Sequence, residues 1–192
     1  MDKISSLYGN KENIIKIRDI FHSNRDLPSV TLPHFFKNKV YTHIKKEILI
    51  LHYKKMMTPI FYSYLAAKPP TNLQTILNSK EFLNFLSSIN GRRIKKIKGS
   101  IECFGWKNYM ILNDEVKEKP GIDVIIDFTD SWDKKFGGSL VYVDGTGSYT
   151  KIPASSNTLI IAERKKNVQK FVQYVNHLCT NRKRFFFLGT LQ

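Results

Sequence analysis

The chain has few cysteines and no long apolar run, and these absences exclude two broad classes of protein. Cys103 and Cys179 belong to no C-x-x-C pair, so a secreted fold held by a disulfide framework is not expected. No run approaches the roughly 18 apolar residues of a membrane-spanning helix. The N-terminus lacks the basic and then apolar pattern of a signal peptide. The sequence therefore predicts an intracellular, cytoplasmic protein in a reducing environment.

The common motifs of phosphate binding and nucleophilic catalysis are also missing. No G-x-x-x-x-G-K-[ST] loop occurs, and Gly145-Thr146-Gly147 is too short and turn-like for a dinucleotide site. Cys179 lies two residues from His177, but that spacing alone does not make a thiol–imidazole pair. Neither a nucleotide site nor a nucleophilic active site is indicated.

Acidic residues are scarce relative to basic ones. The chain has 16 Asp and Glu against 31 Lys and Arg, a net charge of +15. This excess indicates an electrostatic partner, such as nucleic acid, an acidic protein or an anionic membrane surface. The alternative is a base-composition bias in which Lys, Asn and Ile are abundant together. The charge count alone leaves both open.

The basic residues gather in short segments of the chain. The densest cluster is the candidate patch for nucleic acid or an acidic partner, and it comprises Arg92, Arg93, Lys95, Lys96 and Lys98. Two further clusters are Arg164-Lys165-Lys166 and Arg182-Lys183-Arg184. Such segments neutralise phosphates without reading sequence. The alternative interpretation is a solvated strand edge on which lysine prevents aggregation.

The first half of the chain has mainly helical apolar periodicity. At 192 residues with 42% hydrophobic content, the chain is expected to form one globular domain over 1–192. A first helix is predicted from Asn10 to His22, followed by a polar linker from Arg25 to Thr31. A second helix is expected after Pro33, with a basic outer face and an apolar stripe that packs on a sheet. That stripe comprises Phe36, Val40, Ile44, Ile48 and Leu51, and the basic face Lys39, Lys45, Lys46, Lys54 and Lys55.

The pattern changes from helix to strand near Gly91. Pro69-Pro70 breaks the chain, and a further helical stretch then runs from Leu73 to Asn90, with Gly91 as its stop. After it the apolar period falls to about two, and Gly-rich turns punctuate at least seven short strands. We expect an α+β fold built on a β-sandwich or jelly roll, with N-terminal helices packed on the sheet. Residues 1–91 form the mainly helical part and residues 92–192 the jelly-roll part.

The strand-rich half contains a recognisable frame of short segments. These segments are Asn108–Glu115, Ile125–Trp132, Phe136–Leu140, Pro153–Leu159, Lys170–Val175 and Arg184–Gly189. Together they resemble the prolyl-hydroxylase branch of the iron(II)/2-oxoglutarate-dependent dioxygenases, over roughly residues 31 to 191. The resemblance implies a double-stranded β-helix in which a His-x-Asp pair and a distal His hold iron. It also implies an Arg that binds the 2-oxoglutarate cosubstrate.

The metal positions implied by this resemblance carry other residues. None of the five histidines is followed two residues later by Asp or Glu. The three positions correspond to Asn113, Glu115 and Lys170, of which only Glu115 is a plausible ligand. Asn113 offers a neutral amide oxygen, and the ammonium of Lys170 has no lone pair for a metal. Lys170 is instead expected to pair with Glu115 or Asp114.

The cosubstrate position implied by the resemblance is Arg184. A guanidinium matches a carboxylate in a bidentate way. The hydroxyl residue that the family usually has two positions later is replaced by Phe186. The alternative for Arg184 is membership of the exposed basic cluster with Arg182 and Lys183. Binding of a small acid at this position is therefore expected to be weakened.

The sequence supports two functions from different classes. The first is a catalytically inactive dioxygenase-like protein that serves as a binding or scaffold module for an acidic partner or nucleic acid, without iron or 2-oxoglutarate. The second is an active 2-oxoglutarate-dependent dioxygenase, prolyl-hydroxylase-like, that hydroxylates a protein substrate. The second function would need Fe(II) and 2-oxoglutarate. Its metal ligands would be Glu115 with His177, or with a residue of another protein.

Overall fold

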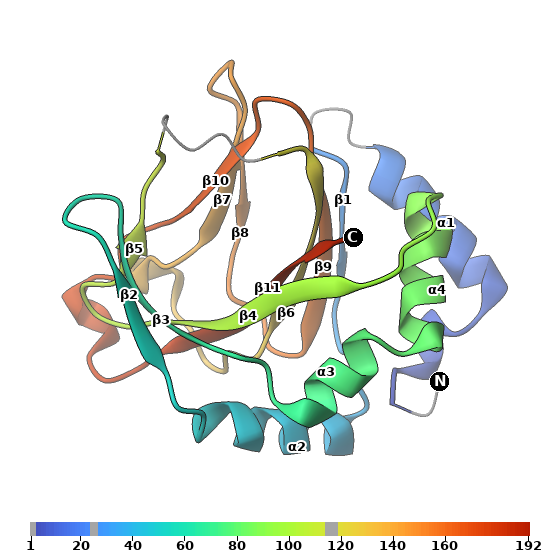
Figure 1. Cartoon of the computed structure of the whole chain (residues 1–192), viewed down its shortest axis with the longest axis horizontal. Coiled ribbons are helices and arrows are strands. Elements are labelled where there is room, and N and C mark those ends of the chain that lie inside the picture. The colour runs from blue at the N-terminus through green and yellow to red at the C-terminus, as the bar shows by residue number, and fades with distance from the viewer. Residues whose placement is uncertain (1–2, 24–26, 114–118) are drawn as a thin grey trace.

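A computed structural model describes residues 3–23, 27–113 and 119–192, and its fold is the expected α+β jelly roll (Figure 1). The helices are α1 (Lys11–Ser23), α2 (Asn38–Leu49), α3 (Thr71–Leu77) and α4 (Lys80–Asn90), with 3₁₀ turns η1 (Ser6–Tyr8), η2 (Lys134–Phe136) and η3 (His177–Cys179). The strands are β1 (Ser29–Leu32), β2 (Lys54–Met57), β3 (Tyr62–Ala67), β4 (Ile97–Phe104), β5 (Tyr109–Met110), β6 (Gly121–Asp127), β7 (Leu140–Val143), β8 (Tyr149–Ile152), β9 (Thr158–Arg164), β10 (Gln169–Val172) and β11 (Arg184–Leu191). None of the described helices is long and apolar enough to cross a bilayer.

The strands form one antiparallel sheet that curls on itself. Its order is β1-β9-β6-β11-β4-β3-β5-β10-β7-β8, with β2 paired to β3. The first part of this order contains the longer strands and comprises β1, β9, β6, β11, β4 and β3. The second part comprises β5, β10, β7 and β8, and it folds back to face the first (Figure 1). Ile125 of β6 and Phe186 of β11 share a buried cluster with Tyr142 of β7 and Val172 of β10. The two halves therefore enclose an interior, as in a double-stranded β-helix.

Strand β6 shows how the sequence sorts residues between the two sides of the sheet. Successive side chains of a strand point to opposite faces. Val124 and Ile126 face the helices, where they join the first buried cluster, whereas Ile125 faces the interior. Asp123 and Asp127 alternate in phase with Ile125 and are also completely buried. The interior of the barrel therefore receives two carboxylates from a single strand.

The helices cover the outer face of the long-stranded half, as predicted. Ile44 and Ile48 of α2 and Phe82 and Phe85 of α4 belong to the same buried cluster as the outward residues of β6 and β9. Helices α1 and α4 pack on each other at one side of the sheet (Figure 1). Helix α4 ends where expected, because Gly91 has a φ of 76° and its N–H bonds the carbonyl of Ser87. This arrangement leaves the two ends of the barrel for the loops.

Three local predictions in the first ninety residues need correction. The helix expected after Pro33 begins only at Asn38, because Asn157 holds the backbone of the preceding residues: its carbonyl accepts from Phe35 N–H and its Oδ1 from Phe36 N–H. The polar linker contains strand β1 from Ser29 onward, which pairs with β9. The residues between α2 and Pro69 form the hairpin of β2 and β3, so Lys54 and Lys55 lie on a strand and not on the back of a helix.

Candidate functional site

The interior of the barrel contains two separate ionic clusters, each built around one carboxylate of β6. Asp127 lies at the end of β6 and pairs with Arg184 at the start of β11. Asp123 lies near the start of β6 and pairs with Arg164 and Lys170. Ile125, between the two carboxylates, packs in the apolar cluster of the interior. The clusters therefore lie near opposite ends of the barrel.

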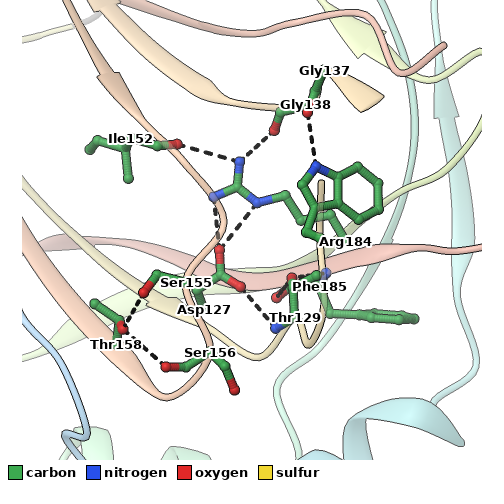
Figure 2. Close-up of polar contacts among 11 residues, drawn as sticks. Asp127, Thr129, Gly137, Gly138, Ile152, Ser155, Ser156, Thr158, Arg184 and Phe185 are labelled. Carbon is green, nitrogen blue, oxygen red and sulfur yellow. Dashed lines mark hydrogen bonds and ion pairs between the residues drawn. The ribbon is translucent and has the colours of Figure 1, made fainter. Parts of the chain in front are cut away.

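The Arg184 side chain is completely buried and is held by Asp127. Its Nε and Nη2 both donate to Asp127 Oδ2, at 3.1 and 2.8 Å. Its Nη1 donates to the carbonyl of Gly138 and, at 3.5 Å, to that of Ile152 (Figure 2). The other carboxylate oxygen of Asp127 accepts from the N–H of Thr129 at 2.8 Å. The Nε and Nη2 groups of Arg184, which could bind the carboxylate of a ligand, are therefore already bound to a carboxylate of the chain itself.

The surroundings of Arg184 make this arrangement rigid. The guanidinium lies 4.9 Å from the ring centre of Phe186, within the range of a cation–π contact. Gly137 has a φ of 78°, and a Cβ on it would lie 2.1 Å from the carbonyl oxygen of Tyr174. The backbone carbonyl of Gly137 accepts a hydrogen bond from the indole N–H of Trp132 at 2.9 Å. Gly137 and Trp132 thus fix the turn that presents the Gly138 carbonyl to Arg184.

Arg184 does not belong to an exposed basic cluster, which corrects that alternative. Its neighbour Arg182 is exposed and donates to the carbonyl of Ser131 at 3.0 Å. Lys183 is also exposed, whereas Arg184 has no accessible surface. Arg182 and Lys183 lie in the exposed segment before β11, whereas Arg184 is the first residue of the strand and is buried. One structural arginine is therefore distinct from two surface cations.

Asp123 is the centre of the second cluster. Its Oδ2 accepts from Arg164 Nε at 2.7 Å and from Tyr142 at 3.0 Å, and lies 3.2 Å from Lys170 Nζ. Its Oδ1 accepts from Arg164 Nη2 at 3.1 Å and Thr190 at 3.0 Å. Burial raises the pKa of the Asp123 carboxyl, but the charges and hydrogen bonds of Lys170 and Arg164 outweigh it and hold that pKa below its ordinary value. The carboxylate is therefore ionised at neutral pH.

The structure brings two of the predicted metal positions together. Asn113 and Lys170 line one small cavity of about 150 Å³ beside the end of β5. Glu115, the third position, and Asp114 lie outside the described residues, so their expected pairing with Lys170 is untested. Lys170 contacts Asp123, a partner that the sequence reasoning did not identify. His177 is exposed in η3, beyond the far end of β10 from Lys170, and does not line this cavity.

The charged residues of these clusters that sequence reasoning missed are Asp123, Asp127 and Arg164. The available signal was the segment Ile122–Asp127, in which an otherwise apolar strand places acidic side chains on one face. A buried carboxylate requires a cationic or hydrogen-bonding partner. That rule would have predicted two buried pairs, but not which cations form them.

The five residues of the predicted basic patch are all exposed. Arg92 and Arg93 line a groove together with Lys165 and Lys166 of the second basic segment. Lys95, Lys96 and Lys98 belong to the same stretch of chain but do not line this groove. The structure therefore joins two basic segments that are about seventy residues apart in the sequence.

Comparison with known proteins identifies the family. A family model described as "Oxoglutarate and iron-dependent oxygenase degradation C-term" matches residues 53–191. The chain belongs to this family. Comparison with curated protein sequences gives no match.

Solved structures of oxygenases share the fold of this family member. A Pseudomonas putida prolyl-4-hydroxylase is 10% identical, with a TM-score of 0.68 over 93% of this chain and 98% of that one. An oxidoreductase of the 2OG-Fe(II) oxygenase family from Burkholderia pseudomallei is 12% identical, with a TM-score of 0.69 over 95% and 92%. A Trichoplax adhaerens prolyl hydroxylase, in complex with a peptide of the hypoxia inducible factor oxygen degradation domain, is 13% identical, with a TM-score of 0.66 over 96% and 91%. The chain therefore has the prolyl-hydroxylase-like fold expected from its sequence.

The described residues do not suit the iron and cosubstrate that the oxygenase fold implies. An Fe(II) site needs neutral imidazoles and a carboxylate, but the described metal positions supply an amide, Asn113, and an ammonium, Lys170. Among the residues that the structure describes, no group of three or more His, Cys, Asp or Glu side chains could hold a metal ion. A 2-oxoglutarate carboxylate would have to displace Asp127 from Arg184.

Proposed function

We propose that this oxygenase-family chain is a catalytically inactive module that binds a partner with its surface. The observation that carries the proposal is the buried pair between Arg184 and Asp127. The anchor that the family uses for 2-oxoglutarate is bound by the chain's own carboxylate, with both side chains at 0% exposure. Breaking such a pair leaves an uncompensated buried charge, at a cost of about 3–5 kcal/mol. Cosubstrate binding would have to overcome that cost.

The second cluster supports the same proposal. Lys170 and Arg164 bring two cations to the carboxylate of Asp123 in the region of the barrel that also contains Asn113. Cations repel a divalent metal, because like charges in a poorly solvated interior interact strongly. The barrel interior thus contains ion pairs of the chain itself where the oxygenase fold would hold a metal and a cosubstrate. On this proposal natural selection retains the fold for its shape and surface.

The proposed partner is an acidic protein segment or a nucleic acid. The exposed cations of Arg92–Lys98 and the excess of +15 charges favour an anionic partner. The Trichoplax relative forms a complex with a peptide, which supports a polypeptide partner for the same fold. We propose the cytoplasm as the compartment, where the buried Cys103 and Cys179 stay as free thiols.

Anaerobic titration with Fe(II) and 2-oxoglutarate tests the proposal. Calorimetry should detect no saturable binding of the metal with its cosubstrate, and aerobic incubation should release no CO₂ from 2-oxoglutarate. Stoichiometric iron binding together with decarboxylation would overturn the proposal. In that outcome the altered ligand set is tested by Glu115→Ala, which should abolish turnover if Glu115 holds the metal.

A further inference from the structure

A basic groove lies where the chain between α4 and β4 meets the ends of β9 and β11. Its volume is about 420 Å³. The backbone of Gln192, just after β11, pairs with Lys95 and Lys96, which sets the end of β11 beside the segment that follows α4 (Figure 1). The start of β6 and the residues after β9 complete the lining. The groove is therefore built from four segments that only the closed sheet brings together.

The charge of the groove is strongly one-sided. Arg92 and Arg93 come from the segment after α4, and Lys165 and Lys166 follow β9. All four are exposed, and Glu163 is the single acidic side chain among the described lining residues. No ion pair joins Arg92, Arg93 or Lys166 to a carboxylate within the described part of the chain. Arg164 also lines the groove, but Asp123 neutralises it from within the barrel.

The remaining lining residues give the groove an apolar component. Ile94 and Ile122 are largely buried, Leu191 is half-buried, and Pro120 is exposed. None of the described lining residues is aromatic, so the groove offers no ring on which a nucleic-acid base could stack. A site that combines cations with aliphatic side chains suits acidic residues interspersed with apolar ones.

We propose that this groove binds an acidic peptide segment of a partner protein. Carboxylates of the peptide meet Arg92, Arg93, Lys165 and Lys166, and an apolar side chain of the peptide contacts Ile94 and Leu191. This inference rests on the proposed function as a binding module and names its site and the chemistry of its partner. It places recognition outside the barrel, separate from the interior that oxygenases use for catalysis.

Charge-reversal variants with a matched control test the groove. A fluorescein-labelled peptide of alternating glutamate and leucine is titrated with the full chain at low salt, and anisotropy reports binding. Arg92→Glu/Arg93→Glu should weaken binding by about tenfold or more. Lys95→Glu/Lys96→Glu changes the net charge equally in the same segment, but outside the groove lining, and should leave affinity within about threefold.

Two further variants test whether the segment after β9 belongs to the site and whether positive charge in the groove drives binding. Lys166→Glu, on the separate segment after β9, should weaken binding in the same direction as the arginine variant. Glu163→Gln should strengthen binding, because it removes the one described negative charge of the groove. Circular dichroism and thermal unfolding of each variant confirm that the fold is intact, and all six substituted positions are at the surface or half-buried.

Three outcomes would overturn the inference. Equal weakening by the groove variant and its control would mean that binding follows overall charge. Absence of peptide binding at low salt would also contradict the inference that the groove binds an acidic peptide. Tighter binding of a labelled single-stranded or double-stranded DNA oligomer, lost in Arg92→Glu/Arg93→Glu, would identify a nucleic-acid surface instead. None of these results depends on the iron and 2-oxoglutarate titration, so failure of the groove and failure of the non-catalytic proposal remain distinguishable.

Discussion

Replacing Asp127 by Asn would test the buried pair with Arg184 directly. The substitution keeps the side-chain shape but removes the negative charge, and it leaves a guanidinium of 0% exposure without a counter-ion. Loss of one partner of a buried ion pair costs about 3–5 kcal/mol. In a domain of this size 1 kcal/mol corresponds to roughly 2–4 °C in Tm. We therefore expect Asp127→Asn to lower the free energy of unfolding by about 3–5 kcal/mol and Tm by about 6–20 °C.

Urea denaturation followed by tryptophan fluorescence and circular dichroism measures this loss. The matched control is Asp19→Asn on the exposed face of α1, which should change stability by less than about 0.5 kcal/mol. The double variant Asp127→Leu/Arg184→Met should be more stable than Asp127→Asn, because no uncompensated charge is left inside the barrel. A loss of under about 1 kcal/mol in Asp127→Asn, typical of an ordinary substitution, would refute the reasoning.

Three further predictions concern other buried groups and the anion site itself. In Asp127→Ala, added formate should raise Tm more than chloride at equal ionic strength, because a small carboxylate can replace the lost one on Arg184. Stability should fall as the pH drops below about 4, because the contribution of Asp123 is fully present above its unfolded-state pKa and is lost as the pH falls through its lower folded-state pKa. Burial raises the pKa of the Cys103 thiol to about 12, so a thiol reagent at about pH 8 should label it only after unfolding in urea.

Each of these predictions has a contrary result. Equal effects of formate and chloride on the thermal unfolding of Asp127→Ala would mean that no anion enters the vacated position. A urea midpoint that depends on pH identically in wild type and Asp123→Asn would show that Asp123 does not contribute to acid sensitivity. Modification of native Cys103 at the rate of the unfolded chain, read by mass spectrometry, would contradict its burial.

The elements with complete local signals were the ones that could be predicted. The helix before Gly91 has both an apolar period and a glycine that tolerates the left-handed conformation, and its end was found at the correct residue. The helix after Pro33 has the apolar helical period, but no glycine marks its end, because the residue after Leu49 is Ile50. The apolar stripe therefore suggested that it continued to Leu51. The β2–β3 hairpin was also missed. Its turn, residues 58–61, contains neither glycine nor asparagine, and its one turn residue, Pro59, was not used.

The candidate site was predictable only as a set of positions. Residue identity alone shows that Asn113 and Lys170 are poor iron ligands. That the two line one cavity is an observation of the structure. The same reasoning left Arg184 open to two interpretations, a carboxylate anchor or a surface cation. It could not choose between them, because burial of a strand residue depends on which strands cover it.

The sequence by itself determined the fold class, the placement of the helices in the first ninety residues, and the absence of a His-x-Asp pair. These follow from period, turn residues and residue type, which are local properties of the chain. Only the tertiary structure decided that Asp127 pairs with Arg184, 57 residues away, and that Asp123 pairs with Arg164 and Lys170, 41 and 47 residues away. It also decided that Arg92 and Lys166 share one groove. Such pairings depend on strand register and on closure of the sheet. A shift of the register by one residue would move the side chains of a strand from the interior to the exterior.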